Sequence, residues 1–319
     1  MMREVILKFN EQFAFKPIVV NAKKLKKTGG FVIAGMGGSH LAGDILKLAD
    51  PNCDIEIYSD YGLPNSPDKK RLMIFNSYSG NTEETLDGYR LARKKKLPMA
   101  AIAVGGKLLD WAKKDGIPYI ELPNVGIQPR SALGFVTMAL LKLMNKEKEF
   151  NQLAKVFKSF KPNELEEAGI SLAKRLINKV PVIYCSRRNS TIAYNWKIKF
   201  NENAKIPAFY NVFPELNHNE MNGFDVVDST KQLSDNFYFI FLNDKKDHSR
   251  IQKRMEITAG LLKDRGLPVE LIPLSENNIF VRIFQSLILA DWTTIKIAEQ
   301  YGLESEKVPM VEEFKKMMV

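Results

Sequence analysis

The stretch that most constrains this chain is NSYSGNTEETL, residues 76–86, which directly follows an apolar run at residues 72–75. The run predicts a buried strand, and the residues from about Glu83 onward predict a helix. Three hydroxyl side chains lie in the turn between them, at Ser77, Ser79 and Thr82. Backbone N–H groups at a helix start have no partner within the helix, and the helix dipole there favours an anion. The turn therefore indicates either a phosphate cradle or an ordinary helix cap, and by itself it does not decide between them.

The same order of strand, turn and helix recurs along the chain. In the first half we expect strands at residues 30–34, 55–59, 72–75, 99–104 and 117–122, and helices at residues 3–15, 41–48, 83–95 and 131–144. In the second half we expect strands at residues 182–185, 237–242 and 268–273, helices at residues 164–179, 191–204, 249–265 and 279–301, and a loop rich in Asn and Pro at residues 206–222. Such alternation predicts parallel sheets with helices on both faces.

The fold class we predict is α/β, with two related, doubly wound domains at residues 1–150 and 151–319. The chain has 319 residues, which is enough for two cores of ordinary size. A charged segment at residues 145–161 ends at Pro162, and after it the pattern begins again. The Ser-bearing turn is degenerate in the second half, which favours one composite site over two equal sites.

Composition excludes several classes of protein. No run of 18 apolar residues occurs, and the first residues do not resemble a signal peptide, so we expect a cytoplasmic protein with no membrane partner. The net charge of +10 comes from scattered Lys and Arg clusters, which favours solvated faces over a nucleic-acid-binding stripe. A basic field also attracts small anionic substrates. Cys53 and Cys185 lie far apart and are expected to be free thiols.

Two further turns of the first half carry candidate ligand-binding residues. GMGGS, residues 35–39, follows a strand but lacks the spacing of a dinucleotide-binding fingerprint, so Gly37, Gly38 and Ser39 suit either a small polar substrate or a plain tight turn. Arg130 follows Pro129 at the start of an apolar helix. A cation there opposes the helix dipole, which indicates either an anionic partner or a solvated surface Arg.

The second half carries two candidate acid–base residues. Glu202 lies near the C-terminal end of a predicted helix, where it is either a general base or an exposed side chain paired with Lys199 or Lys205. His218 is one of only three histidines and lies in a polar loop, so it is either an acid–base residue or a solvated one. No His, Cys or carboxylate spacing suggests a metal site, and we expect no cofactor.

Taken together, these motifs resemble the bifunctional phosphoglucose/phosphomannose isomerase family, which is built from two sugar isomerase (SIS) domains. The matching motifs are GMGGS, SYSGNTEETL, PRSALG, NENAK and NHNE, in that order, and residues 291–316 resemble the family's last helix and lysine-bearing tail. NENAK together with NHNE is the most specific part of the match. The resemblance implies a homodimer that interconverts glucose 6-phosphate, and mannose 6-phosphate as well, with fructose 6-phosphate in glycolysis and gluconeogenesis.

The resemblance also implies a role for each candidate residue. The sugar 6-phosphate would be bound by Ser39, Ser77, Ser79 and Thr82. Glu202 would move a proton between C1 and C2 through a cis-enediol, and Arg130 would stabilise the developing negative charge. His218 of the neighbouring subunit and Lys315 would assist ring opening, although Lys316 is adjacent and that assignment could slip by one residue.

Two departures from the family's pattern bear on specificity. His40 follows the GMGGS serine where relatives more often have a small residue, and residues 302–309 differ from the relatives' D-P-T-P-type tail. The main rival from another class is a non-catalytic sugar-phosphate sensor, which would keep residues 77–82 but need no base and would usually carry a DNA-binding domain. A second rival, an isomerase of pentose or amino-sugar phosphates, would normally have a single SIS domain or a glutaminase.

Overall fold

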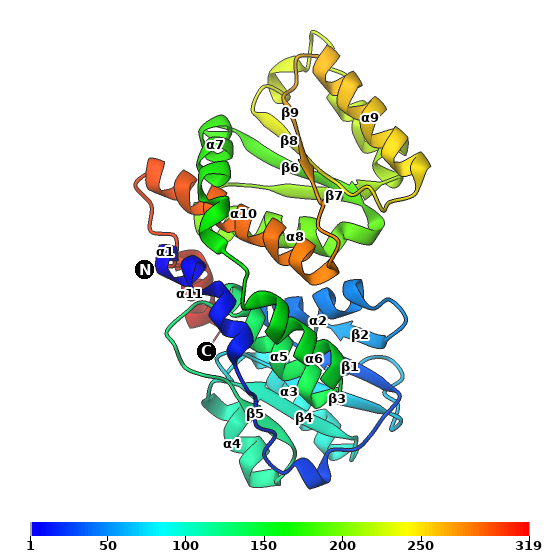
Figure 1. Ribbon diagram of the computed structural model, residues 1–319, viewed down its shortest axis with the longest axis vertical. Helices are drawn as coiled ribbons and strands as arrows, with labels where there is room; N and C mark the ends of the chain where they lie inside the picture. The colour runs from blue at the N-terminus through cyan, green and yellow to red at the C-terminus, as the bar shows by residue number, and fades with distance from the viewer. Residues whose placement is uncertain (1, 319) are drawn as a thin grey trace. The chain divides into compact units, whose positions relative to one another are not determined.

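A computed structural model describes residues 2–318, and the chain forms two compact units (Figure 1). The first unit is Lys8–Lys161, and the second unit combines the N-terminal residues up to Leu7 with the chain from Pro162 onward. This division, between Lys161 and Pro162, lies 11 residues beyond the expected boundary at residues 150 and 151, which falls within a helix. That helix, α6 (Glu147–Phe157), lies in the first unit, where the ring of Phe157 stacks on Phe13 with 3.8 Å between centroids.

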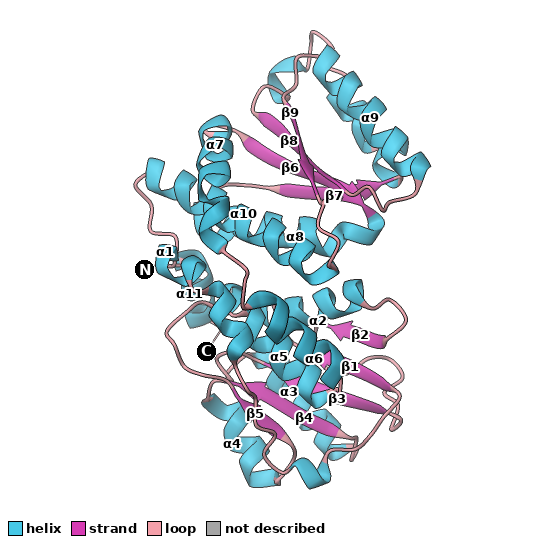
Figure 2. Cartoon of the chain, viewed as in Figure 1, coloured by secondary structure: helices cyan, strands magenta, loops and turns pink. Residues whose placement is uncertain are grey.

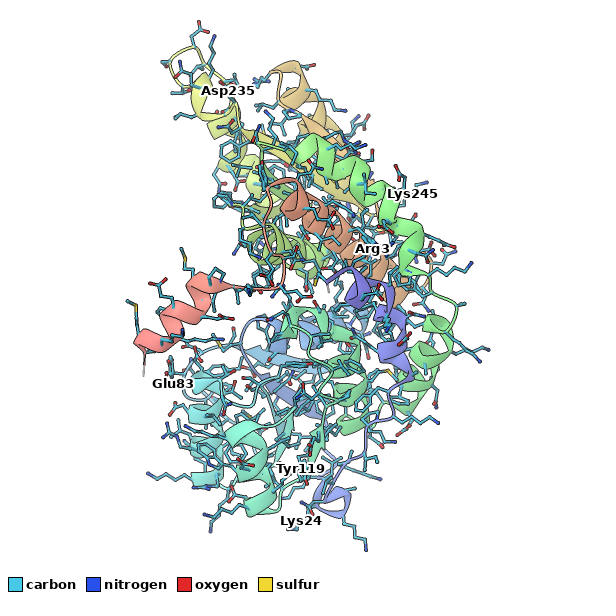
Figure 3. All side chains as sticks on the ribbon, turned by 90° about the vertical axis from the view of Figure 1, so that its left-hand side faces the viewer. Arg3, Lys24, Glu83, Tyr119, Asp235 and Lys245 are labelled. Atoms are coloured by element: carbon cyan, nitrogen blue, oxygen red, sulfur yellow. The ribbon has the colours of Figure 1, made fainter. Side chains whose placement is uncertain are left out.

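The first unit contains a five-stranded sheet in the order β2-β1-β3-β4-β5, and all neighbouring strands are parallel. Its strands are β1 (Gly30–Ala34), β2 (Asp54–Tyr58), β3 (Arg71–Asn76), β4 (Met99–Ala103) and β5 (Tyr119–Glu121). At the β5 edge, Val20 bridges to Tyr119 and Lys24 donates to the carbonyl of Gly116 (Figure 3). The N-terminal segment therefore covers an edge that would otherwise expose unpaired backbone groups.

Helices cover both faces of this sheet (Figure 2). On one face, α3 (Glu83–Lys94) and α4 (Gly106–Asp115) pack on alternate strand residues. For example, Tyr89 of α3 contacts Phe75 of β3, with 5.6 Å between ring centroids. On the other face lie α2 (Gly38–Ala49) and α5 (Leu133–Leu143), and Gly43 of α2 sits directly on Ile33. Sequence reasoning did not assign α4, because the two glycines at its start are typical of a turn.

The second unit repeats this design with the strand order β7-β6-β8-β9, again parallel throughout. Its strands are β6 (Val180–Ser186), β7 (Phe209–Phe213), β8 (Phe237–Asn243) and β9 (Val269–Pro273). The helices are α7 (Glu166–Leu176), α8 (Ser190–Lys199), α9 (Ser249–Asp264), α10 (Ile279–Gln300) and α11 (Pro309–Met317). Figure 1 shows α9 on one face of the sheet and α7, α8 and α10 on the other. The prediction of two α/β folds with parallel sheets is confirmed.

Two local predictions were wrong, and one expected helix is helical over its full range but changes type. The expected loop at residues 206–222 contains β7, an edge strand whose aromatic and β-branched residues lie between two prolines that suggested a loop. The expected helix at residues 191–204 changes at Phe200 from α-helix to a π-helix. The expected opening helix at residues 3–15 is split into α1 (Met2–Leu7) and a 3-10 helix, because α1 joins the second unit, where Arg3 pairs with Glu166 at 3.0 Å.

Among residues 2–318, no helix combines the length and the hydropathy needed to cross a bilayer.

Candidate functional site

The turns after β1, β3 and β4 and the segment that carries Arg130 meet at the carboxyl-terminal ends of the first sheet's strands, and glycines make the contacts possible. A Cβ on Gly38 would lie 2.7 Å from the backbone nitrogen of Arg130, and a Cβ on Gly35 would lie 2.6 Å from the carbonyl oxygen of Asn76. In the turn after β3, Gly80 has a φ of +73°, and a Cβ there would lie 1.7 Å from the carbonyl oxygen of Gly105. Ligands of parallel sheets bind at this edge, so the predicted cradle lies where such a site is expected.

Hydrogen bonds between hydroxyls and backbone give the cradle its shape. The Ser39 hydroxyl accepts from the N–H of Tyr78 at 3.1 Å and so ties the turn after β1 to the turn after β3. The Ser77 oxygen accepts from the N–H of Gly80 at 3.1 Å and lies 2.8 Å from the Thr82 oxygen. Ser39 and Ser77 are therefore buried parts of the framework.

The remaining predicted phosphate-binding residues are more accessible. Ser79 and Gly37 are exposed, whereas Thr82 and Gly38 are half-buried. Gly38 begins α2 and Thr82 is the N-cap of α3, so the partial positive charges of two helix starts lie at this edge. The structure thus brings together hydroxyls, backbone N–H groups and two helix dipoles, which is the chemistry of an anion site.

Two polar residues next to these turns, His40 and Arg130, are buried. His40 is buried, and its Nδ1 lies 2.6 Å from the Asp44 carboxylate one turn further along α2. Arg130 is 3 % exposed, so the alternative of a solvated surface Arg was wrong. It lies in a 3-10 helix, Pro129–Ser131, just before α5.

Gln12 is a site residue that sequence reasoning missed. Its side chain is buried, donates to the carbonyl of Ser131 at 2.7 Å and accepts from the N–H of Gly134 at 2.9 Å. It therefore fixes the backbone that carries Arg130. Asn10 and Glu11 directly precede it, so nothing in the local sequence marks this polar side chain as the buried one.

In the second unit, Glu202 lies at the centre of the π-helix Phe200–Ala204 and is half-buried. The residues around it anchor this turn to α10. Lys199 donates to the Asp291 carboxylate at 2.7 Å, and Asn203 donates to the same oxygen at 3.3 Å and to Thr294 at 3.0 Å. Single π-turns within α-helices are frequent at functional sites. Asp291, whose anchoring role the sequence did not reveal, holds this one in place.

Lys205 ends the π-helix. Its backbone adopts the left-handed conformation, with φ of +55°, and its ammonium group donates to the carbonyl oxygen of Glu202 at 3.0 Å. It also donates to the carbonyls of Asn203 and Glu304. Lys199 and Lys205 thus stabilise the backbone on either side of the Glu202 carboxylate.

His218 is exposed at the end of the 3-10 helix Glu215–His218, and its neighbours are held firmly. Asn217 donates to Thr258 at 2.8 Å, and Glu220 accepts from the buried Tyr184 hydroxyl at 2.6 Å. Burial, with this hydrogen bond, raises the pKa of Tyr184 far above its usual range, so the hydroxyl stays a proton donor to Glu220.

Lys315 is exposed on α11, as is Lys316 beside it. Within the second unit, Glu202, His218 and Lys315 therefore lie on three separate elements, whereas the predicted residues of the first unit gather at one sheet edge. Among residues 2–318, no group of three or more His, Cys, Asp or Glu side chains is arranged to hold a metal ion.

Solved structures resemble this chain at low sequence identity. One is a glucosamine-6-phosphate deaminase from Thermotoga maritima, with a TM-score of 0.70 and 14% identity over 97% of this chain and 96% of the other. Another is a tagatose-6-phosphate ketose/aldose isomerase from Escherichia coli, with a TM-score of 0.63 and 16% identity over 96% of this chain and 89% of the other. At such identities the likeness concerns the fold alone.

Sequence comparisons are more specific. A family model for the bacterial phospho-glucose isomerase C-terminal SIS domain matches residues 165–318. A protein of Sulfolobus acidocaldarius named D-glucosamine-6-phosphate 4-epimerase is 30% identical over 87% of this chain and 85% of its own.

Two relatives are named bifunctional phosphoglucose/phosphomannose isomerase. The one from Caldicellulosiruptor bescii is 37% identical over 93% of this chain and 91% of its own. The one from Aquifex aeolicus is 34% identical over 98% of this chain and 96% of its own. Identity of this extent over nearly whole chains means that this chain belongs to the bifunctional phosphoglucose/phosphomannose isomerase family.

Proposed function

We propose that this chain is an aldose–ketose isomerase that interconverts glucose 6-phosphate and mannose 6-phosphate with fructose 6-phosphate through a cis-enediol. The observation that carries the proposal is the anchored π-helix, which presents Glu202 while Lys199 and Asn203 are bound to Asp291. A general base must be held in one geometry to act, and the buried Lys199–Asp291 ion pair before Glu202, with the Asn203 hydrogen bonds after it, supplies that rigidity.

The phosphate group is bound by the cradle of the first unit. Its charge is met by the N–H groups and dipoles at the starts of α2 and α3. The hydroxyls of Ser79 and Thr82 donate to its oxygens, while Ser39 ties the two turns together and Ser77 shapes the turn after β3. Anchoring the phosphate leaves the other end of the sugar for the chemistry.

Glu202 takes the proton from C2 of the aldose and returns it to C1 of the enediol, so the same carboxylate serves as base and then as acid. Negative charge develops on the oxygens at C1 and C2 during this step, and the Arg130 guanidinium stabilises it. His218 and Lys315 assist ring opening. Because His218 is exposed on its own chain, it suits donation to a second copy in a homodimer.

The test is a coupled assay of both aldose 6-phosphates with Glu202→Gln, which keeps the shape of the side chain but cannot accept a proton. We expect kcat to fall by about 10²–10⁴, the loss typical of removing a general base, with KM little changed. The exposed Glu256→Gln on α9 is the matched control and should retain full activity. Full activity of Glu202→Gln would overturn the mechanism. Loss of wild-type activity on adding a chelator would overturn it as well.

Glucosamine 6-phosphate should be included as a third substrate, because one relative is named as its 4-epimerase. Turnover of that sugar alone would replace the isomerase proposal by an epimerase.

Gel filtration with light scattering tests the dimer, since an active monomer would exclude donation of His218. We place the enzyme in the cytoplasm, in glycolysis and gluconeogenesis, where its two free thiols, Cys53 and Cys185, stay reduced.

A further inference from the structure

The second sheet repeats the phosphate turn of the first at the same place. In the strand orders β2-β1-β3-β4 and β7-β6-β8-β9, β8 corresponds to β3. β3 ends at Asn76 and β8 at Asn243. The carbonyls of the next residues, Ser77 and Asp244, accept an N–H from three residues further on, at 2.9 and 3.0 Å. A helix follows each turn, so Asp244 stands where the first unit has Ser77.

In the second turn, the Asp244 carboxylate stands where the first has the Ser77 hydroxyl, and a second carboxylate, Asp247, stands where the first has Gly80. Asp244 is fully buried and Asp247 nearly so, while Lys245 between them is exposed (Figure 3). Ser186 donates to Asp247 at 2.8 Å, and the Asn189 amide lies 3.3 Å from the Asp244 carboxylate. Ser186 and Asn189 belong to the turn between β6 and α8, the counterpart of the turn that carries Ser39. Side chains of the protein thus supply both the anion and its donors.

Arg282, in the first turn of α10, provides the buried opposing charge, and the exposed Arg188 lies further away, with its Nη1 4.0 Å from the Asp244 carboxylate. Arg282 is 2 % exposed, and its Nη1 lies 3.7 Å from the same carboxylate. That distance allows an ion pair but no hydrogen bond, and Nε and Nη1 find no hydrogen-bond partner among residues 2–318. Unmet guanidinium donors at a buried site are costly, and they match an anion with more oxygen atoms than a carboxylate offers.

We propose that the second sheet holds a closed copy of the phosphate cradle, in which the Asp244 carboxylate is the resident anion of Arg282 and replaces a bound phosphate. The chain therefore binds phosphate at the first sheet only, and removing the Asp244 carboxylate opens a site for an inorganic phosphate ion at the second. This assignment does not depend on the isomerase reaction, because its test is a binding measurement.

The test follows the unfolding of the second unit by tryptophan emission. Of the three tryptophans, Trp196 and Trp292 are fully buried in this unit, so a Trp111→Phe background removes the signal of the first unit. In this background Asp244→Ala should lower Tm by roughly 10 °C, the shift for breaking a buried ion pair in a domain of this size. About 50 mM inorganic phosphate should restore roughly 5 °C of it, and chloride of equal ionic strength should not.

Two further variants decide the outcome. Asp244→Ala combined with Arg282→Met removes both partners of the buried ion pair and leaves neither charge without the other, so it should be more stable than Asp244→Ala alone and should not respond to phosphate. This comparison holds even where Asp244→Ala fails to fold. Asp235→Ala, at an exposed Asp of the same unit (Figure 3), should change neither Tm nor the phosphate response. Equal phosphate shifts in the single and double variants, or a double variant no more stable than the single, would overturn the proposal.

Discussion

The turns after β3 and β8 share a strand-ending Asn, a backbone hydrogen bond and a following helix. They differ in the next side chain, which is a hydroxyl in the first turn and a carboxylate in the second. In the first turn the Ser77 hydroxyl accepts a backbone hydrogen bond and carries no charge, so an anion in this turn would be a bound ligand. In the second, Asp244 brings an anion of its own. The backbone of the two turns is alike, and the difference lies at one position. A serine there leaves room for an external anion, whereas an aspartate fills the turn with its own carboxylate.

The largest effect is expected for Ser77→Asp, which places the aspartate of the second turn at the equivalent position of the first. The site of Ser77 is fully buried, so the carboxylate would meet the substrate phosphate at close range without solvent screening. We expect kcat/KM for glucose 6-phosphate to fall by about 10³ or more, about 4 kcal/mol. Circular dichroism checks folding, and Ser77→Ala serves as the control that adds no charge and should lose far less.

The helix caps after the two turns offer a smaller contrast. The Thr82 hydroxyl, which contacts Ser77, accepts no capping hydrogen bond from the first N–H groups of α3, whereas the His248 side chain accepts from the N–H of Arg250 in α9. Thr82→Ala should therefore raise KM several-fold with little change in stability. His248→Ala should cost about 1 kcal/mol of unfolding free energy with KM unchanged. Steady-state kinetics and urea unfolding on both variants measure the two effects, and a KM effect in His248→Ala would contradict the contrast.

The smallest expected effect concerns pH. Burial is the main cause that raises the pKa of the Asp247 carboxyl above its ordinary value. Ionisation is then harder in the folded than in the unfolded chain, so stability falls as pH rises from about 4, the unfolded value, through the raised folded value.

Asp247→Asn removes this dependence while keeping an acceptor for Ser186. Urea unfolding between about pH 4 and pH 7 should show the wild-type chain losing more unfolding free energy than the variant across this range. Parallel stability curves would mean that Asp247 carries no such penalty.

The strands and the cradle followed from local patterns. The strand at residues 30–34 was predicted to the residue, and the strands that became β2, β3 and β4 to within one or two residues. Runs of apolar residues between glycines have few alternatives to a buried parallel strand. The hydroxyls at residues 77–82 were found for the same reason, since a strand-to-helix turn places them together whatever the rest of the chain does.

The sequence alone therefore sufficed for two parallel α/β folds and for the position of the hydroxyl-rich turn after β3, because these depend on neighbours along the chain. Tertiary structure decided that β7 joins a sheet edge and that Gln12 supports the turn of Arg130. It also decided that Lys199 pairs with Asp291, 92 residues away, and that Asp244 faces Arg282. Such buried polar pairs depend on which helix faces lie together, and periodicity marks a face as apolar without naming the partner of the charge within it.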